Sequence, residues 1–119
     1  MENVIEIKKS KFYGYSFDVK SVEEVKEILE KLKKQHKKAT HVCYAYKITC
    51  GQEYVKFFDD GEPSGTAGRP IFNVIDKKKL NNILVVVVRY FGGIKLGAGG
   101  LTRAYSNCAS SLFLEEKCK

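Results

Sequence analysis

The chain has 119 residues and a mass of 13.5 kDa, the size of one ordinary domain able to bury about two-thirds of its unfolded surface. Its composition, 44% hydrophobic and 29% charged, is typical of a folded globular protein and excludes wholesale disorder. The longest apolar run, 83–88, is far shorter than the roughly 20 residues of a transmembrane helix, and the N-terminal residues lack a signal-peptide core. We therefore expect a single cytoplasmic domain over residues 1–119, without a membrane partner.

The formal net charge of +7 is concentrated in the second half of the chain. Residues 1–62 carry twelve Lys against eleven Asp or Glu, whereas residues 63–114 carry seven Lys or Arg against a single Asp. Such an excess attracts anions without choosing among phosphate groups, nucleic acid and an acidic protein surface. The sequence contains no signal specific for DNA.

The four cysteines, Cys43, Cys50, Cys108 and Cys118, show neither zinc-knuckle nor redox spacing, so we interpret them as reduced thiols. A zinc site built from three of them and His41 is an alternative that the irregular spacing disfavours. We expect no metal and no cofactor. His41 stands at the start of a predicted strand, and we interpret it as a structural residue rather than a general base.

The first third of the chain predicts two short strands and a helix. Residues 4–7 and 12–17 alternate in the manner of strands. Ser21 followed by Glu24 is a capping-box signature, and apolar residues recur at helical spacing over 22–32.

Lysines gather at the end of this predicted helix: Lys31, Lys33, Lys34, Lys37 and Lys38. Cations at a helix C-terminus complement the macrodipole. We interpret the cluster as a solvated helix end rather than a nucleic-acid patch.

The rest of the chain predicts a hairpin, a central strand and a closing helix. Alternation over 42–48 and 53–58 indicates the hairpin, and residues 83–88, apolar at every position, indicate a strand covered on both faces. From Leu101 to Leu112 one helical face is apolar. The pattern predicts an α+β fold, with a mixed β-sheet and helices packed on one face.

Eight of the ten glycines lie between Gly61 and Gly100, within segments 59–70 and 89–103. Glycine in a folded element costs about 0.5–1 kcal/mol relative to alanine, so this density implies tight geometry or close approach of another group. A strand, a glycine loop and a helix N-terminus together present main-chain N–H groups to an anion. The loop is neither a Walker A motif nor a dinucleotide fingerprint, which disfavours NTP hydrolysis and NAD binding.

The first glycine segment begins with a dense acidic group, Asp59, Asp60 and Glu62, that could hold a magnesium ion. The preferred interpretation is that Asp59 and Asp60 end the hairpin, while Ser64 and Thr66 hydrogen-bond main-chain donors at the entry to a short helix. Ser64 lacks a nucleophile elbow and a following histidine, so we assign no catalytic residue.

Both glycine segments, DDGEPSGTAGRP (59–70) and VVRYFGGIKLGAGGL (87–101), followed by RAYS (103–106), resemble the signature of the YigZ/IMPACT family. Residues 9–12 (KSKF) and 41–46 (HVCYAY) also resemble family positions. The similarity spans essentially the whole chain, which therefore resembles a single Impact N-terminal-type domain.

The resemblance implies the fold shared by domain IV of elongation factor G and domain 2 of ribosomal protein uS5. It also implies a role around translation, since eukaryotic members regulate translational initiation in a starvation response. Bacterial and eukaryotic relatives usually carry a second domain, whereas we expect one domain here.

We therefore predict a non-enzymatic, translation-associated regulator that binds RNA, the ribosome or an acidic translation-control protein. The residues expected to receive the partner are Arg69, Arg89, Lys95, Gly97, Gly99, Gly100 and Arg103, beside the signature residues Asp59, Asp60, Glu62, Ser64 and Thr66. The alternative is an enzyme that holds a small molecule or a phosphate group against Gly97–Gly100, with Asp59, Asp60 or Glu62 as base or metal ligand. Convergence of both glycine segments on one pocket favours the alternative.

Overall fold

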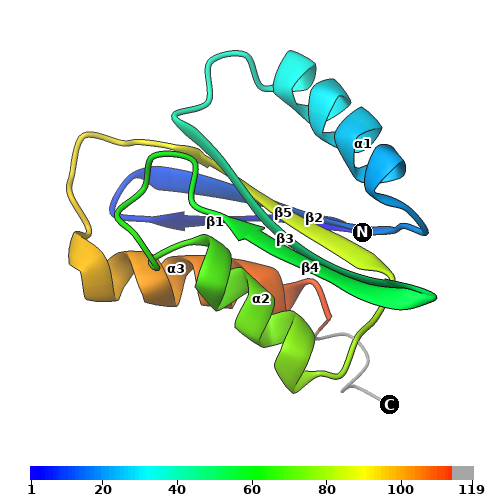
Figure 1. Ribbon diagram of the computed structural model, residues 1–119. Helices are drawn as coiled ribbons and strands as arrows, with labels where there is room; N and C mark the ends of the chain where they lie inside the picture. The colour runs from blue at the N-terminus through cyan, green and yellow to red at the C-terminus, as the bar shows by residue number, and fades with distance from the viewer. Residues whose placement is uncertain (114–119) are drawn as a thin grey trace.

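The computed structural model describes residues 1–113, which fold as a five-stranded sheet and three helices (Figure 1). In chain order the elements are β1 (Glu2–Ile7), β2 (Ser10–Asp18), α1 (Val22–Gln35), β3 (His41–Cys50), β4 (Gln52–Phe58), α2 (Gly68–Lys77), β5 (Ile83–Tyr90) and α3 (Gly97–Ser111). Every predicted strand and helix is present, and the α+β class is confirmed. None of the helices within residues 1–113 combines the length and the apolar character that crossing a membrane requires.

The sheet has the order β1-β2-β5-β3-β4, and every neighbouring pair of strands is antiparallel. The expectation of a mixed sheet is therefore corrected. The central place of β5 is confirmed, since β2 and β3 both pair with it. The connections that join β2 to β3 and β4 to β5 each contain a helix. Each joins two strands that run in the same direction and are separated in the sheet by one antiparallel strand.

The helices cover both faces of the sheet, so the expectation of helices on one face is also corrected. Figure 1 shows α1 on one side of the sheet and α2 with α3 on the other. Alternate side chains of a strand point to opposite faces. On β5, Val85 and Val87 join the core beneath α2 and α3, whereas Val86 and Val88 join the core beneath α1. A strand that is apolar at every position needs a cover on each face, and α1 provides the second one.

The sequence predicts the first residues of the two long helices, α1 and α3, to within a few positions. At α1, Ser21 Oγ accepts the Glu24 amide (3.2 Å), and Glu24 Oε1 accepts the Lys20 amide (2.6 Å), so the capping interaction is confirmed. The closing helix α3 starts at Gly97, four residues before the apolar stripe begins at Leu101. The last glycines of the second segment are thus helical, in the first turn of α3.

Candidate functional site

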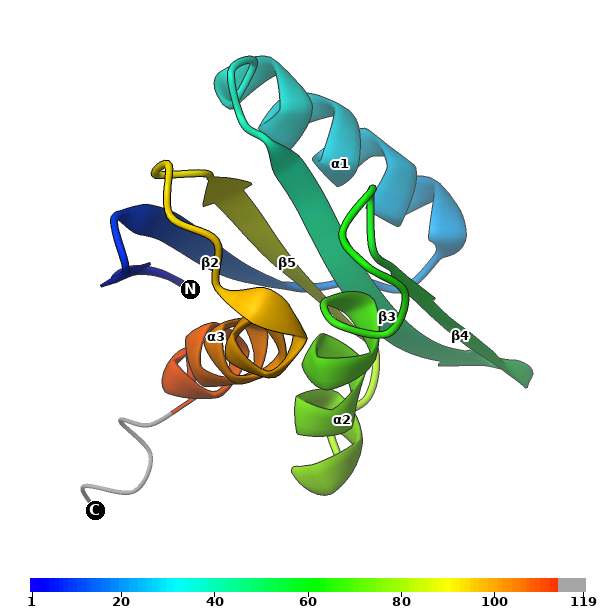
Figure 2. The same ribbon diagram turned by 90° about the vertical axis from the view of Figure 1, so that its left-hand side faces the viewer.

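Loops that are distant in sequence meet at one end of the sheet, where β5 ends (Figure 2). The turn between β1 and β2 lies against Gly92, because a Cβ there would fall 1.9 Å from Lys9 O. The Gly92 amide donates to Ser10 Oγ (3.2 Å). The loop that follows α1 is attached through Thr40 Oγ1, which accepts the Phe91 amide (2.9 Å). These contacts fix the second glycine segment between two other loops.

A buried ion pair joins the two glycine segments. Arg89 Nη1 lies 2.8 Å from Glu62 Oε2 and 3.1 Å from Oε1, and the two residues are only 5% and 7% exposed. The Tyr105 hydroxyl of α3 donates to Glu62, and Arg89 Nη2 donates to Ser10 Oγ (3.3 Å). Arg89 Nε is buried without a hydrogen-bond partner. Arg89 therefore holds the loops together, and its charge is compensated by Glu62.

His41 lies beside this pair. Its Nδ1 is 2.7 Å from the Asp60 carbonyl oxygen, to which it donates, and its Nε2 is 3.5 Å from Glu62 Oε1. The imidazole therefore ties the start of β3 to the first glycine segment, in agreement with a structural role. Burial raises the pKa of the neighbouring Cys43 thiol, so this cysteine is held in its neutral form.

The acidic residues of the first segment shape their own loop. Asp59 Oδ1 accepts the amides of Ala67 (3.1 Å) and Gly68 (2.9 Å), and Asp59 Oδ2 accepts the Gly65 amide (3.0 Å). Asp59 thereby caps α2, whose own N-cap residue provides no side-chain cap. Asp60 Oδ2 accepts the amide of Val42 (2.7 Å).

The predicted hydrogen-bonding role of Thr66 is corrected by this arrangement. Its Oγ1 donates to the Pro63 carbonyl (2.6 Å) instead of accepting a main-chain amide, and Asp59 is the residue that caps α2. Ser64 is exposed on the loop. Within residues 1–113 no group of three or more His, Cys, Asp or Glu side chains is placed to hold a metal ion.

The two glycine segments converge on one open cavity of about 430 Å³. Glu62 and Pro63 line it from the first segment, and Phe91, Lys95 and Gly97 line it from the second. The helix α3 begins at this rim with no side-chain cap and no acidic residue in its first turn. The partial positive charge of its N-terminus is therefore not neutralised by a local carboxylate.

The structure distributes the predicted cations over three different settings. Lys95 is exposed at the cavity rim, and Arg103 lies on the outer side of α3, with its guanidinium beside Gly99. Arg69 lies on α2, where its guanidinium stacks 5.4 Å from the ring of Phe57 and its Nε contacts Asn73. Lys95 and the start of α3 are thus brought together, and Arg89 lines the same cavity with its charge paired to Glu62.

Sequence reasoning missed the buried hydroxyl groups of the site, Ser10 and Tyr105, both 0% exposed. Ser10 was visible only as a small residue between lysines, and Tyr105 only as part of the apolar stripe of α3. Their motifs, KSKF and RAYS, were the available signal. The partner of each hydroxyl lies dozens of residues away in sequence, and local patterns do not reveal such pairs.

The fold and the site define a class of protein: an α+β domain in which a buried carboxylate–arginine pair joins two glycine-rich segments. The sequence model of the Impact N-terminal domain matches residues 8–113. The chain belongs to this family.

Bacterial relatives include the IMPACT family members YvyE from Bacillus subtilis, 50% identical over 109 residues, and YigZ from Escherichia coli, 41% identical over 104 residues. The matches cover 92% and 86% of this chain but 50% and 51% of the relatives. Protein IMPACT from Rattus norvegicus is 33% identical over 113 residues, which cover 92% of this chain and 35% of that protein. The chain thus spans about half the length of the bacterial relatives it matches.

Solved structures similar to this one include the following two. A hypothetical protein superposes with a TM-score of 0.88 at 38% identity, over 97% of this chain and 56% of the other. The two-domain translational regulator Yih1 superposes with a TM-score of 0.58 at 26% identity, over 92% of this chain and 44% of Yih1.

Proposed function

We propose that the protein is a non-enzymatic regulator of translation that binds the RNA of the ribosome through the end of the sheet where the glycine segments meet. A role in translation is supported by the similarity to the translational regulator Yih1 and by membership of the family that includes the IMPACT proteins. The chemistry of the partner is inferred from the site itself.

One observation carries the choice of an anionic partner: the carboxylates of the first segment are engaged internally, whereas Lys95 and Arg103 remain exposed. Asp59 and Asp60 accept main-chain amides, and Glu62 pairs with Arg89. The outward charge at the rim is therefore positive, and the uncapped start of α3 adds to it. Gly97, Gly99 and Gly100 leave the main chain there accessible to a phosphate group.

Co-sedimentation with purified bacterial ribosomes over a salt series tests the proposal. Phosphate contacts release counterions, so binding should weaken steeply as salt rises. The double variant Lys95→Glu/Arg103→Glu should reduce binding at low salt by about tenfold or more. The matched control is Lys20→Glu/Lys77→Glu, which changes the net charge equally at the far end of the molecule. Absence of co-sedimentation at low salt, insensitivity to salt, or equal loss in both variants would contradict the proposal.

A second candidate function is supported by the cavity. Both glycine segments line it, as a site for a small phosphorylated molecule would require. A base drawn from the first segment is harder to reconcile with the geometry, because Asp59 and Asp60 already accept amides. Thermal melts with inorganic phosphate, pyrophosphate and nucleotides test it. A rise in the midpoint that follows ligand concentration and disappears in Lys95→Glu would favour this candidate, and no rise would count against it.

A further inference from the structure

The lysines at the end of α1 are fixed to the same end of the molecule as the glycine segments. His36, the C-cap residue of α1, contacts the Tyr15 hydroxyl through Nε2 (2.7 Å) and the Tyr90 hydroxyl through Nδ1 (2.5 Å). Four residues later, the Thr40 amide donates to the Arg89 carbonyl (2.8 Å). The loop that carries Lys37 and Lys38 is therefore held at both ends against β5. A helix end that only needed solvation would require no such attachment.

The turn between β1 and β2 adds two more cations. Lys8 and Lys9 have φ angles of 48° and 70°, the left-handed pair that a two-residue type I′ turn requires. Asn-Gly is the preferred occupant of such a turn, and left-handed lysines are strained. Strain that persists at a surface turn points to a role for the side chains that cause it. The close approach to Gly92 places this turn beside the second glycine segment.

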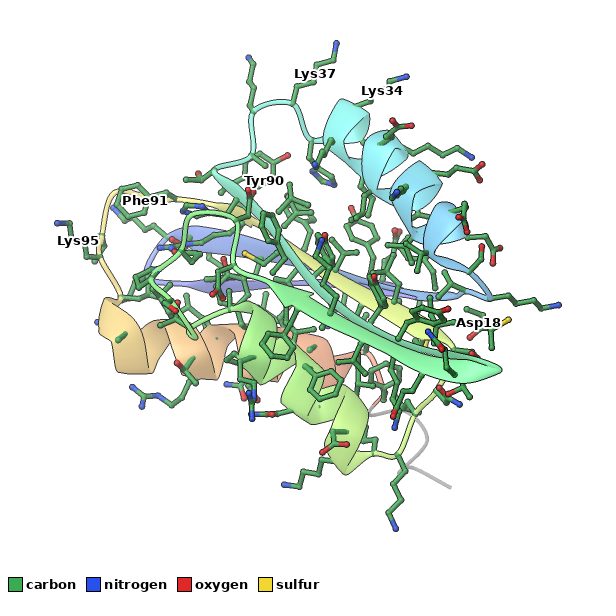
Figure 3. The ribbon with its side chains drawn as sticks, viewed as in Figure 1. Asp18, Lys34, Lys37, Tyr90, Phe91 and Lys95 are labelled. Carbon is green, nitrogen blue, oxygen red and sulfur yellow. The ribbon has the colours of Figure 1, made fainter. Side chains whose placement is uncertain are left out.

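The exposed lysines at this end of the molecule are Lys8, Lys9, Lys34, Lys37, Lys38 and Lys95, and we call the end of the sheet that carries them the basic end. Figure 3 shows Lys34 and Lys37 pointing outward at the end of α1 and Lys95 pointing outward near Phe91, with Asp18 at the opposite end of the sheet. The far end carries exposed carboxylates, among them Asp18, Glu23 and Glu24. Exposed lysines, among them Lys20 and Lys77, lie there as well, so the far end is of mixed charge.

An exposed aromatic ring distinguishes the basic end from a simple charged patch. Phe91 is 45% exposed and Ile94 is 42% exposed, both in the loop that carries Lys95. Lysines on separate loops suit a flexible chain of phosphates, and an exposed ring lets an unpaired base stack.

We propose that the basic end binds single-stranded RNA, with lysines of the three loops neutralising successive phosphates and Phe91 stacking on a base. The proposal rests on the proposed function and extends its site beyond the cavity rim. It assigns a binding role to the lysines of the α1 end, which the sequence pattern alone had favoured as a solvated helix end.

Fluorescence anisotropy with a labelled, unstructured 12-nucleotide RNA tests it. The logarithm of affinity should fall with the logarithm of salt by about 0.7 for each phosphate neutralised. Lys37→Glu/Lys38→Glu should weaken binding by about tenfold or more at low salt and reduce the salt slope. Phe91→Ala should weaken it without changing the slope. The control Lys20→Glu/Lys77→Glu should bind within about twofold of the original protein.

A second variant protects the test against misfolding. Lys8→Asn/Lys9→Gly relieves the strained turn, so it should raise the melting temperature while it weakens RNA binding. Unchanged RNA binding in this variant and in Lys37→Glu/Lys38→Glu would overturn the proposal. Competition by poly-glutamate as effective as by unlabelled RNA would also overturn it, in favour of an acidic protein partner.

The two proposals can fail separately. Ribosome co-sedimentation that depends on Lys95 and Arg103, without binding of the 12-nucleotide RNA, would overturn only the further inference. Loss of both kinds of binding at low salt would overturn the proposed function as well.

Discussion

Removal of the Glu62 carboxylate should be among the most destabilising single changes in this protein. Glu62→Ala leaves Arg89, 5% exposed, as a buried charge that keeps its hydrogen bond to the Ser10 hydroxyl but loses its counter-charge. Breaking a buried pair in this way costs about 3–5 kcal/mol, because the surviving charge loses its compensation and remains out of water. The Tyr105 hydroxyl also loses its acceptor, which is part of the same loss.

This loss of unfolding free energy can be converted into an expected fall in melting temperature. Unfolding entropy of about 2.1 cal/mol/K per residue gives about 0.25 kcal/mol/K for 119 residues. A loss of 3–5 kcal/mol therefore corresponds to a fall in melting temperature of about 12–20 °C. Calorimetry and urea denaturation followed by circular dichroism measure the two quantities independently.

The double variant Glu62→Leu/Arg89→Met separates the charge from the packing. It removes both ions and should recover part of the loss, although the Tyr105 hydroxyl still costs about 1–3 kcal/mol without its acceptor. A loss of less than about 1 kcal/mol in Glu62→Ala would mean that the pair behaves as a surface salt bridge. The assignment of Arg89 as an internal brace would then be wrong.

Three other predictions concern separate parts of the molecule. Gly92→Ala should destabilise the protein by about 1–3 kcal/mol in urea melts, because the added Cβ meets the main chain of the β1–β2 turn. The control Gly99→Ala has room for its Cβ and should stabilise α3 by about 0.5–1 kcal/mol. Burial lowers the pKa of His36 below its ordinary 6.5, so the unfolded chain binds this proton more strongly. Stability should therefore decline as pH falls below about 6.5, and His36→Gln should remove this part of the pH dependence in melts at pH 5 and 7.5. Burial raises the pKa of Cys108 to about 12, so iodoacetamide at pH 8 should modify exposed Cys50 and spare Cys108 in the native protein, as mass spectrometry would report; equal labelling would contradict the burial.

Local patterns predicted the elements well because they depend on neighbours in the chain. Ser21 and Glu24 interact three residues apart, and the strand and helix periods are visible within a short window. The uninterrupted apolar run of β5 required cover on both faces, which placed this strand at the centre. The motifs also sufficed to identify the family.

The roles of individual charges could not be predicted in this way. Arg89 and Lys95 have the same sign and stand six residues apart, yet one is sealed against Glu62 and the other is exposed. Which of them meets solvent depends on the strand alternation and on a carboxylate 27 residues earlier in the chain. Likewise Asp59 was recognised as a residue that ends the hairpin, but its three amide donors become visible only once the loop has closed.

The amino-acid sequence by itself determined the α+β class, the order of the elements and the family, since these follow from short-range periodicity and from motifs. Only the tertiary structure decided that α1 covers the opposite face from α2 and α3, that Glu62 and Arg89 neutralise each other, and that lysines from three distant segments share one end of the sheet. The reason is that burial and charge compensation are properties of neighbours in space. The antiparallel register of the strands brings those neighbours together, and no short stretch of the chain contains that information.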